Sequence, residues 1–302
     1  MGPGSNDPTG REAQSAGRLS GRTAVLLLLL FILAGTGLRL LVISNTAYLA
    51  NSSYSSYMKS SLNFVDSDKV FLSKTEEWID SNPVFEEYFV LKGDGPSYSG
   101  LFWQLVRSNH PPLYYVLLHS LIGLSPDKTA TPGKGFAINM AGFWLSAFLV
   151  GLLGFQLTRD YLLALFAGFL YSVNPLSMEA FVLHKGYELQ VTFILLVLAL
   201  IFSFQDKTEL RIFHYFCYGT ACVSAFLVHY YSYLWVAGIC LIILAQYTWI
   251  SWNPGRLVRM AITTLMAVFT AVLAYPPIIH DLLTDHRSLE IREKLIAPES
   301  HL

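Results

Sequence analysis

The sequence predicts an all-α integral membrane protein, a polytopic helical bundle with a large first loop on the exoplasmic side. Of its 302 residues, 53% are hydrophobic and only 14% are charged, a balance typical of a chain surrounded by lipid. Apolar runs of membrane-spanning length recur along the chain. The 20 basic and 21 acidic residues nearly cancel, so we expect membrane lipids and no nucleic acid as partners.

The chain opens with a polar tail, residues 1–22, whose Gly, Ser and Pro content predicts a disordered cytoplasmic segment. Residues 23–43 form the first apolar run, close to the roughly 20 residues that a bilayer core requires. Residues 24–33 also have the length of a signal-peptide core and precede small residues. Because apolar sequence continues beyond them, we favour an uncleaved anchor over a cleaved signal.

Further apolar segments continue the bundle, which we place within residues 23–280, and a polar tail follows at residues 281–302. These spans are predicted at residues 136–157, 161–173, 189–204, 212–228, 232–250 and 257–279, which gives seven crossings with the first.

Residues 111–124 are the ambiguous segment, because they are too short for a normal crossing. Cytoplasmic links favour Lys and Arg, so the tail and the link with Arg256 and Arg259 are assigned to the cytoplasm. The acidic link ending at Glu188 is assigned outside. These assignments agree only if residues 111–124 are re-entrant or lie against the membrane, which is therefore our prediction.

This topology makes residues 45–109 a large exoplasmic loop. Ser73 and Glu76 match a capping box, which indicates a helix start. Leu101 and Leu105 belong to an apolar stripe on a second short helix. The stripe fits either the bilayer interface or packing onto the bundle.

Several polar and aromatic side chains converge on the same face in this topology. Ionisable groups at membrane depth are costly and commonly mark a site. The candidate substrate-binding residues are His110, Tyr114, Glu179, Lys185, Tyr187, His229 and Tyr230, and the candidate catalytic acids are Asp66 and Asp68.

Residues 110–115 read His-Pro-Pro-Leu-Tyr-Tyr. This hexapeptide resembles a signature of the integral-membrane glycosyltransferases related to protein O-mannosyltransferases and aminoarabinose transferases. Lys185-Gly186-Tyr187 resembles the family's later Arg-x-Tyr element, with lysine in place of arginine, and His229-Tyr230 resembles its His-Tyr pair. The resemblance covers residues 23–250.

The resemblance implies a GT-C fold, in which the first exoplasmic loop covers the active site. It also implies a sugar donor carried on polyprenyl or dolichyl phosphate. Lys185 is then the candidate cation for the donor phosphate, and snorkelling toward lipid headgroups is the alternative role of this side chain.

Two departures from the family pattern bear on activity. The family carries an early acidic residue that acts as a base or binds a divalent metal ion, whereas residues 45–61 contain no carboxylate. Either Asp66 or Asp68 serves instead, or the base is missing. The chain is also shorter than the family pattern, which fits a fragment, a short variant or one subunit of a larger assembly.

Three functions therefore remain open. The first is a lipid-phosphate-sugar-dependent glycosyltransferase that acts at the exoplasmic face. The second is a catalytically degenerate GT-C-like subunit of a membrane protein complex, with other membrane proteins as partners. The third is a transporter, which requires buried charge in the spans; there we identified chiefly Arg39, near the end of the first span.

Overall fold

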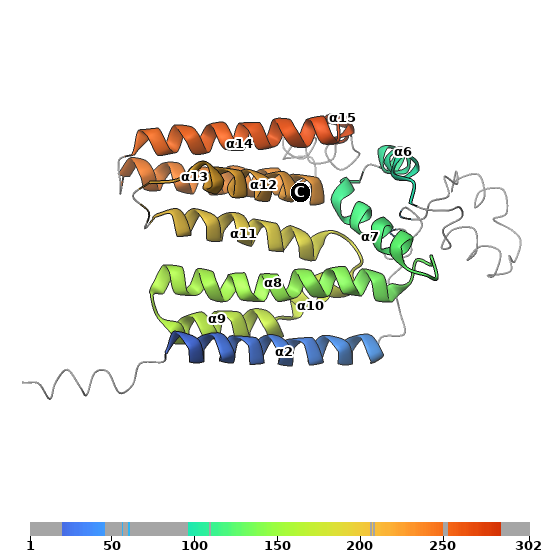
Figure 1. Ribbon diagram of the computed structural model, residues 1–302, viewed down its shortest axis with the longest axis horizontal. Helices are drawn as coiled ribbons and strands as arrows, with labels where there is room; N and C mark the ends of the chain where they lie inside the picture. Colours follow the sequence, from blue (N-terminus) through green and yellow to red (C-terminus); the bar gives the residue numbers. More distant parts are fainter. Residues whose placement is uncertain are drawn as a thin grey trace, which may run out of the picture.

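The protein is a bundle of long, roughly parallel helices, seen side-on in the computed structural model (Figure 1). The structure describes residues 20–45, 56, 60, 96–108, 110–205, 207, 209–249 and 253–284, and all of its regular elements over this part of the chain are helical. Four of them are long and apolar enough to cross a membrane: α2 (Gly21–Asn45), α8 (Pro132–Thr158), α11 (Tyr187–Gln205) and α14 (Pro254–Ala274).

The segment at residues 161–173 differs from its prediction as a full crossing. It forms α9 (Tyr161–Val173), which is followed after one residue by α10 (Pro175–Val182) at a bend of 49°. Asn174 is extended because the residue before a proline is driven out of the helical region, and its side chain then caps α10 by accepting from the Leu176 amide. Together the two helices make at most one broken span, the fifth of the described bundle.

The remaining predicted spans are helical at or near their predicted positions. α12 (Ile212–Val228) has 17 residues and is short for a crossing, and α13 (Ser232–Trp249) has 18. The last predicted span, at residues 257–279, ends early at Tyr275, because Pro276 interrupts it before the short α15 (Pro277–Thr284). The described residues therefore support four to five crossings by length and composition, where the sequence predicted seven.

The helices pack in a row. α2 contacts α9, α9 contacts α8, and the row continues through α11 and α12 to α14, with α13 against the last three. Glycines permit the closest approach at the α2 side: a Cβ atom on Gly168 would lie 2.5 Å from the Leu28 side chain. α2 and α14, at the two edges of the row, leave many large apolar side chains exposed, as expected for surfaces that face lipid.

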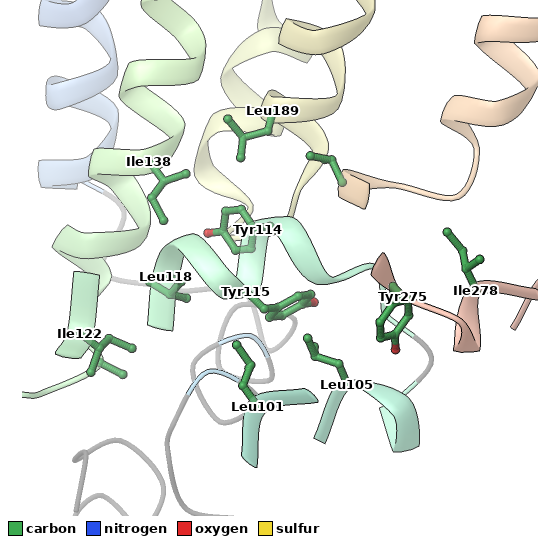
Figure 2. Packing of buried hydrophobic residues seen from close by; sticks show 12 residues of the cluster. Leu101, Leu105, Tyr114, Tyr115, Leu118, Ile122, Ile138, Leu189, Tyr275 and Ile278 are labelled. Atoms are coloured by element: carbon green, nitrogen blue, oxygen red, sulfur yellow. The ribbon is translucent and has the colours of Figure 1, made fainter. Parts of the chain in front are cut away.

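The ambiguous segment is α7 (Pro112–Leu124), a helix of 13 residues that lies across one end of the bundle at an angle to the long helices (Figure 1). A proline at its first turn needs no hydrogen-bond partner there. α6 (Tyr98–Ser108) packs on its outer side through Leu101 and Leu105 (Figure 2). The stripe predicted on that short helix thus packs onto α7, which favours the packing interpretation over the interfacial one.

Alternation of helix direction sorts the connections into two sets (Figure 1). The end of α2, α7, the link between α10 and α11, the turn at residues 229–231 and α15 lie at one end, which we call the α7 end. The links at residues 159–160 and 207–211 and the start of α14 lie at the opposite end. Residues 1–19, the capping box at residues 73–76 and most of the tail at residues 281–302 lie outside the described residues.

Candidate functional site

Three motifs that are far apart in the sequence meet at the α7 end. Gly186, in the link before α11, lies against Val228 at the end of α12 and against Tyr114 of α7. A Cβ atom on Gly186 would lie 2.9 Å from Val228 Cγ1, 3.0 Å from the Val228 carbonyl oxygen and 3.5 Å from Tyr114 Cβ. Only glycine fits without displacement, so this residue type fixes how closely the link approaches α7 and α12.

Aromatic and imidazole rings surround this contact. The rings of Tyr187 and His229 lie 5.4 Å apart between centroids, and His229 stacks on Tyr231 at 5.3 Å. The His110 ring meets the edge of Tyr115 at 5.6 Å, and Tyr115 in turn lies close enough to Tyr187 for the two phenols to interact electrostatically. The cluster thus combines apolar ring faces with imidazole nitrogens and phenol hydroxyls.

The structure brings most of the predicted substrate-binding residues to this place. Tyr114 is fully buried and its ring points toward the bundle (Figure 2). The others at the α7 end are partly buried: His110, Lys185, Tyr187, His229 and Tyr230. Glu179 is different, because it is exposed on α10 and its carbonyl receives the Leu183 amide at 3.0 Å as that helix ends. Asp66 and Asp68 lie outside the described residues.

Lys185 sits in a tight turn, in which its amide donates to the Leu183 carbonyl at 2.7 Å. Asn139 of α8 holds the same turn in place, because its side-chain amide donates to the carbonyls of Phe181 at 2.7 Å and Leu183 at 3.0 Å. The backbone that presents Lys185 is therefore anchored to a long helix.

Burial also lowers the pKa of two imidazoles near this end. His184 is buried against Phe136, with ring centroids 4.2 Å apart, and desolvation lowers its pKa to about 4. His119 of α7 is buried as well. Desolvation lowers its pKa, although its Nδ1 lies 2.9 Å from the Ser60 carbonyl and that contact opposes the shift. Both are neutral structural groups at pH 7.

Beneath the α7 end lies a charged cluster that the sequence analysis did not assign to the site. Arg39 of α2 and Glu188 of α11 are both fully buried. The Arg39 guanidinium donates to the Ser172 carbonyl at 2.8 Å and to Ser177 Oγ at 2.5 Å, and its carbon lies 3.4 Å from the Phe143 ring centroid. Such burial is costly and is retained only with good partners.

Glu188 has its own partner. Tyr171 Oη donates to Glu188 Oε1 at 2.8 Å. Gly142 makes room for the side chain, because a Cβ atom there would lie 3.1 Å from Glu188 Cγ. Glu188 Oε2 and Arg39 Nε are buried without a hydrogen-bond partner in the structure.

A sequence signal for this cluster was present. The sequence places Arg39 near the end of the first span and Glu188 in a polar link. Each of them is nevertheless an ionisable residue within or directly beside an apolar run. Such residues usually face the interior of a bundle and pair there. Pairing the two would have identified the cluster.

The resemblance implied a divalent metal ion as an alternative role for the early acid. Among the residues that the structure describes, no group of three or more His, Cys, Asp or Glu side chains is placed to hold a metal ion.

Comparison of the chain with protein-family models, with curated proteins and with solved structures gave no match. The described helices define a multi-pass integral membrane protein of the all-α class. The polar and aromatic side chains of the three motifs gather at one end of the bundle, near the buried charges of Arg39 and Glu188.

Proposed function

We propose that this protein is a membrane glycosyltransferase that moves a sugar from a polyprenyl or dolichyl phosphate to an acceptor hydroxyl at the exoplasmic face. One observation carries the proposal: the segments at residues 110–115, 185–187 and 229–230, which resemble family elements, meet around Gly186. The GT-C fold and the exoplasmic position of the site are part of the proposal. They are supported by the end-capping α7 and by the basic residues at the opposite end.

The chemistry assigns a separate role to each group. The acceptor oxygen forms a bond to the anomeric carbon of the sugar, while the bond from that carbon to the phosphate oxygen breaks. The lipid phosphate leaves with the electron pair, and Lys185 stabilises its negative charge. The acceptor proton goes to a carboxylate, for which Asp66 or Asp68 is the candidate. His110, Tyr187, His229 and Tyr230 supply ring faces and polar atoms for the sugar.

Binding of the donor is tested first with polyprenyl phosphate, the lipid part that these donors share. Purified full-length protein in detergent is titrated with polyprenyl phosphate carrying no sugar. We expect the wild type to bind and Lys185→Gln to bind about 10-fold or more weakly, since a charge-assisted bond to phosphate is lost. Lys134→Gln is the matched control, because Lys134 lies near the same end but is paired with Asp127 at 2.7 Å. Equal binding by the two variants, or none by the wild type, contradicts the proposal.

Transfer is tested with polyprenyl-phosphate sugars and the variants Asp66→Asn and Asp68→Asn. Loss of the true base should lower the transfer rate by about 10²–10⁴-fold in one variant and leave the other near wild type. Donor binding without any transfer by the wild type, together with copurification of a larger complex, would instead identify the degenerate-subunit alternative.

A further inference from the structure

The buried charges beneath the site are each held by a hydrogen bond to a hydroxyl group. Arg39 donates to Ser177 Oγ, and Tyr171 Oη donates to Glu188 Oε1. The first bond joins α2 to α10, and the second joins α9 to α11.

Each charge in this cluster therefore has a hydroxyl partner of its own, Ser177 for Arg39 and Tyr171 for Glu188. The two charges also attract each other through space. A buried pair organised in this way is neutral as a unit, whereas removal of one member leaves an uncompensated charge inside the bundle.

The charged cluster is attached to both ends of the segment that carries the site. Ser177 lies in α10, before residues 178–187, and Glu188 lies directly after them. Arg39 of α2 thus fixes the start of the segment and Tyr171 of α9 fixes its end. Asn139 of α8 fixes the middle through the Phe181 and Leu183 carbonyls.

Three anchors from three different helices leave the tip of the segment little freedom. The tip is Lys185-Gly186-Tyr187, and it presses on Val228 and Tyr114. Glu188 faces α8 and α9, through Gly142 and Tyr171, while its neighbour Tyr187 faces His229 of α12. These anchors therefore hold the backbone on both sides of the residues that form the site.

We infer that Arg39, Ser177, Tyr171 and Glu188 are positioning residues, which set the place of Lys185 and Tyr187 from inside the bundle. This inference rests on the proposed function for its catalytic meaning, but the placement itself is measurable without any activity. Misplacement of a binding group by about 1 Å costs about 10²-fold in rate where the group acts on the reacting atoms.

The test uses full-length protein in detergent and two readouts. The first is the rate of modification of Lys185 by a water-soluble amine reagent, measured by mass spectrometry with Lys128 and Lys134 as internal references. The second is binding of polyprenyl phosphate. The variants are Tyr171→Phe, which removes the hydrogen bond to Glu188 without changing a charge, and the double variant Arg39→Gln with Glu188→Gln, which removes both charges together. Trp144→Phe is the control, because it removes another side-chain bond between α2 and α8, from Trp144 Nε1 to Thr36 Oγ1 at 2.9 Å.

We expect Tyr171→Phe and the double variant to change the Lys185 modification rate at least 3-fold and to weaken polyprenyl phosphate binding about 10-fold, with Trp144→Phe at wild-type values for both. The double variant should fold even if Tyr171→Phe does not, because it leaves no lone charge. A folded double variant with wild-type Lys185 reactivity and binding would overturn the inference. Altered Lys185 reactivity in a protein whose wild type binds no polyprenyl phosphate would support the positioning role and refute the proposed function.

Discussion

The guanidinium carbon of Arg39 lies 3.4 Å from the centroid of the Phe143 ring, so that an aromatic face on α8 receives the charge carried by α2. Both side chains are fully buried. In a desolvated setting such a cation–π contact contributes about 2 kcal/mol. The contact therefore ties the first span to the centre of the row.

Phe143→Leu should lower the free energy of unfolding by about 2 kcal/mol or more, because the lost ring attraction adds to the lost packing. The measurement is reversible unfolding in mixed detergent micelles. Phe155→Leu, on the same helix, is the control, since Phe155 stacks on Tyr161 at 4.5 Å and none of the cations in the described part of the chain lies over its ring. An equal loss in both variants would show that the charge contributes nothing.

Two glycines of α2 provide a test of close packing within one helix. A Cβ atom on Gly35 would lie 2.9 Å from Phe143 Cζ and 3.0 Å from Ser172 Cβ, whereas a Cβ atom on Gly37 would meet nothing within 4 Å. Gly35→Ala should therefore destabilise the protein by about 1–3 kcal/mol, and Gly37→Ala should be neutral or slightly stabilising. Thermal unfolding of the two variants checks this. Similar melting temperatures would contradict the packing of α2 against α8 and α9.

The main outlines of the fold were predictable, because apolar runs report burial in lipid directly. The positions of α2, α8, α12 and α13 follow their predicted spans within a few residues, and the short length of residues 111–124 predicted a segment that does not run with the long helices. Two features of the spans were predicted wrongly. Pro276 interrupts the span predicted at residues 257–279, whose hydropathy alone indicates a continuous segment. The segment at residues 161–173 ends before Pro175 as predicted, but it makes at most one broken span together with α10.

The site was predictable where the residues are polar and lie between spans. His110, Lys185 and His229 do lie at one end of the bundle, as alternating helix directions require. The buried pair of Arg39 and Glu188 was not predicted. A charged residue at the edge of an apolar run resembles a boundary residue unless a partner from another helix is considered with it. Here the two residues are 149 positions apart in the sequence.

His184 should make stability depend on pH. Its pKa is about 4 in the folded protein and about 6.5 when exposed, so the unfolded chain binds the extra proton first. Stability is then fully present above about pH 6.5 and is lost progressively as the pH falls toward 4, by about 3 kcal/mol at most. His119 acts in the same direction. We expect His184→Gln to flatten the decline of melting temperature between pH 7 and 5, and an unchanged decline would exclude His184 as its source.

The placement of α7 predicts which loops share a side of the membrane. The test introduces single cysteines into a chain whose own cysteines are replaced by alanine. The three positions are Ser97 before α6, Asp127 after α7, and Glu209 at the opposite end of the bundle. A membrane-impermeant maleimide added to intact cells should label Ser97→Cys and Asp127→Cys alike, because a helix of 13 residues is too short to traverse the bilayer core. Glu209→Cys should react only after permeabilisation, since the links at its end carry the basic residues that favour the cytoplasm. Labelling of Ser97→Cys and Asp127→Cys from opposite sides would mean that α7 crosses the membrane. Lys185 and His110 would then face different compartments, and the site proposed here could not form.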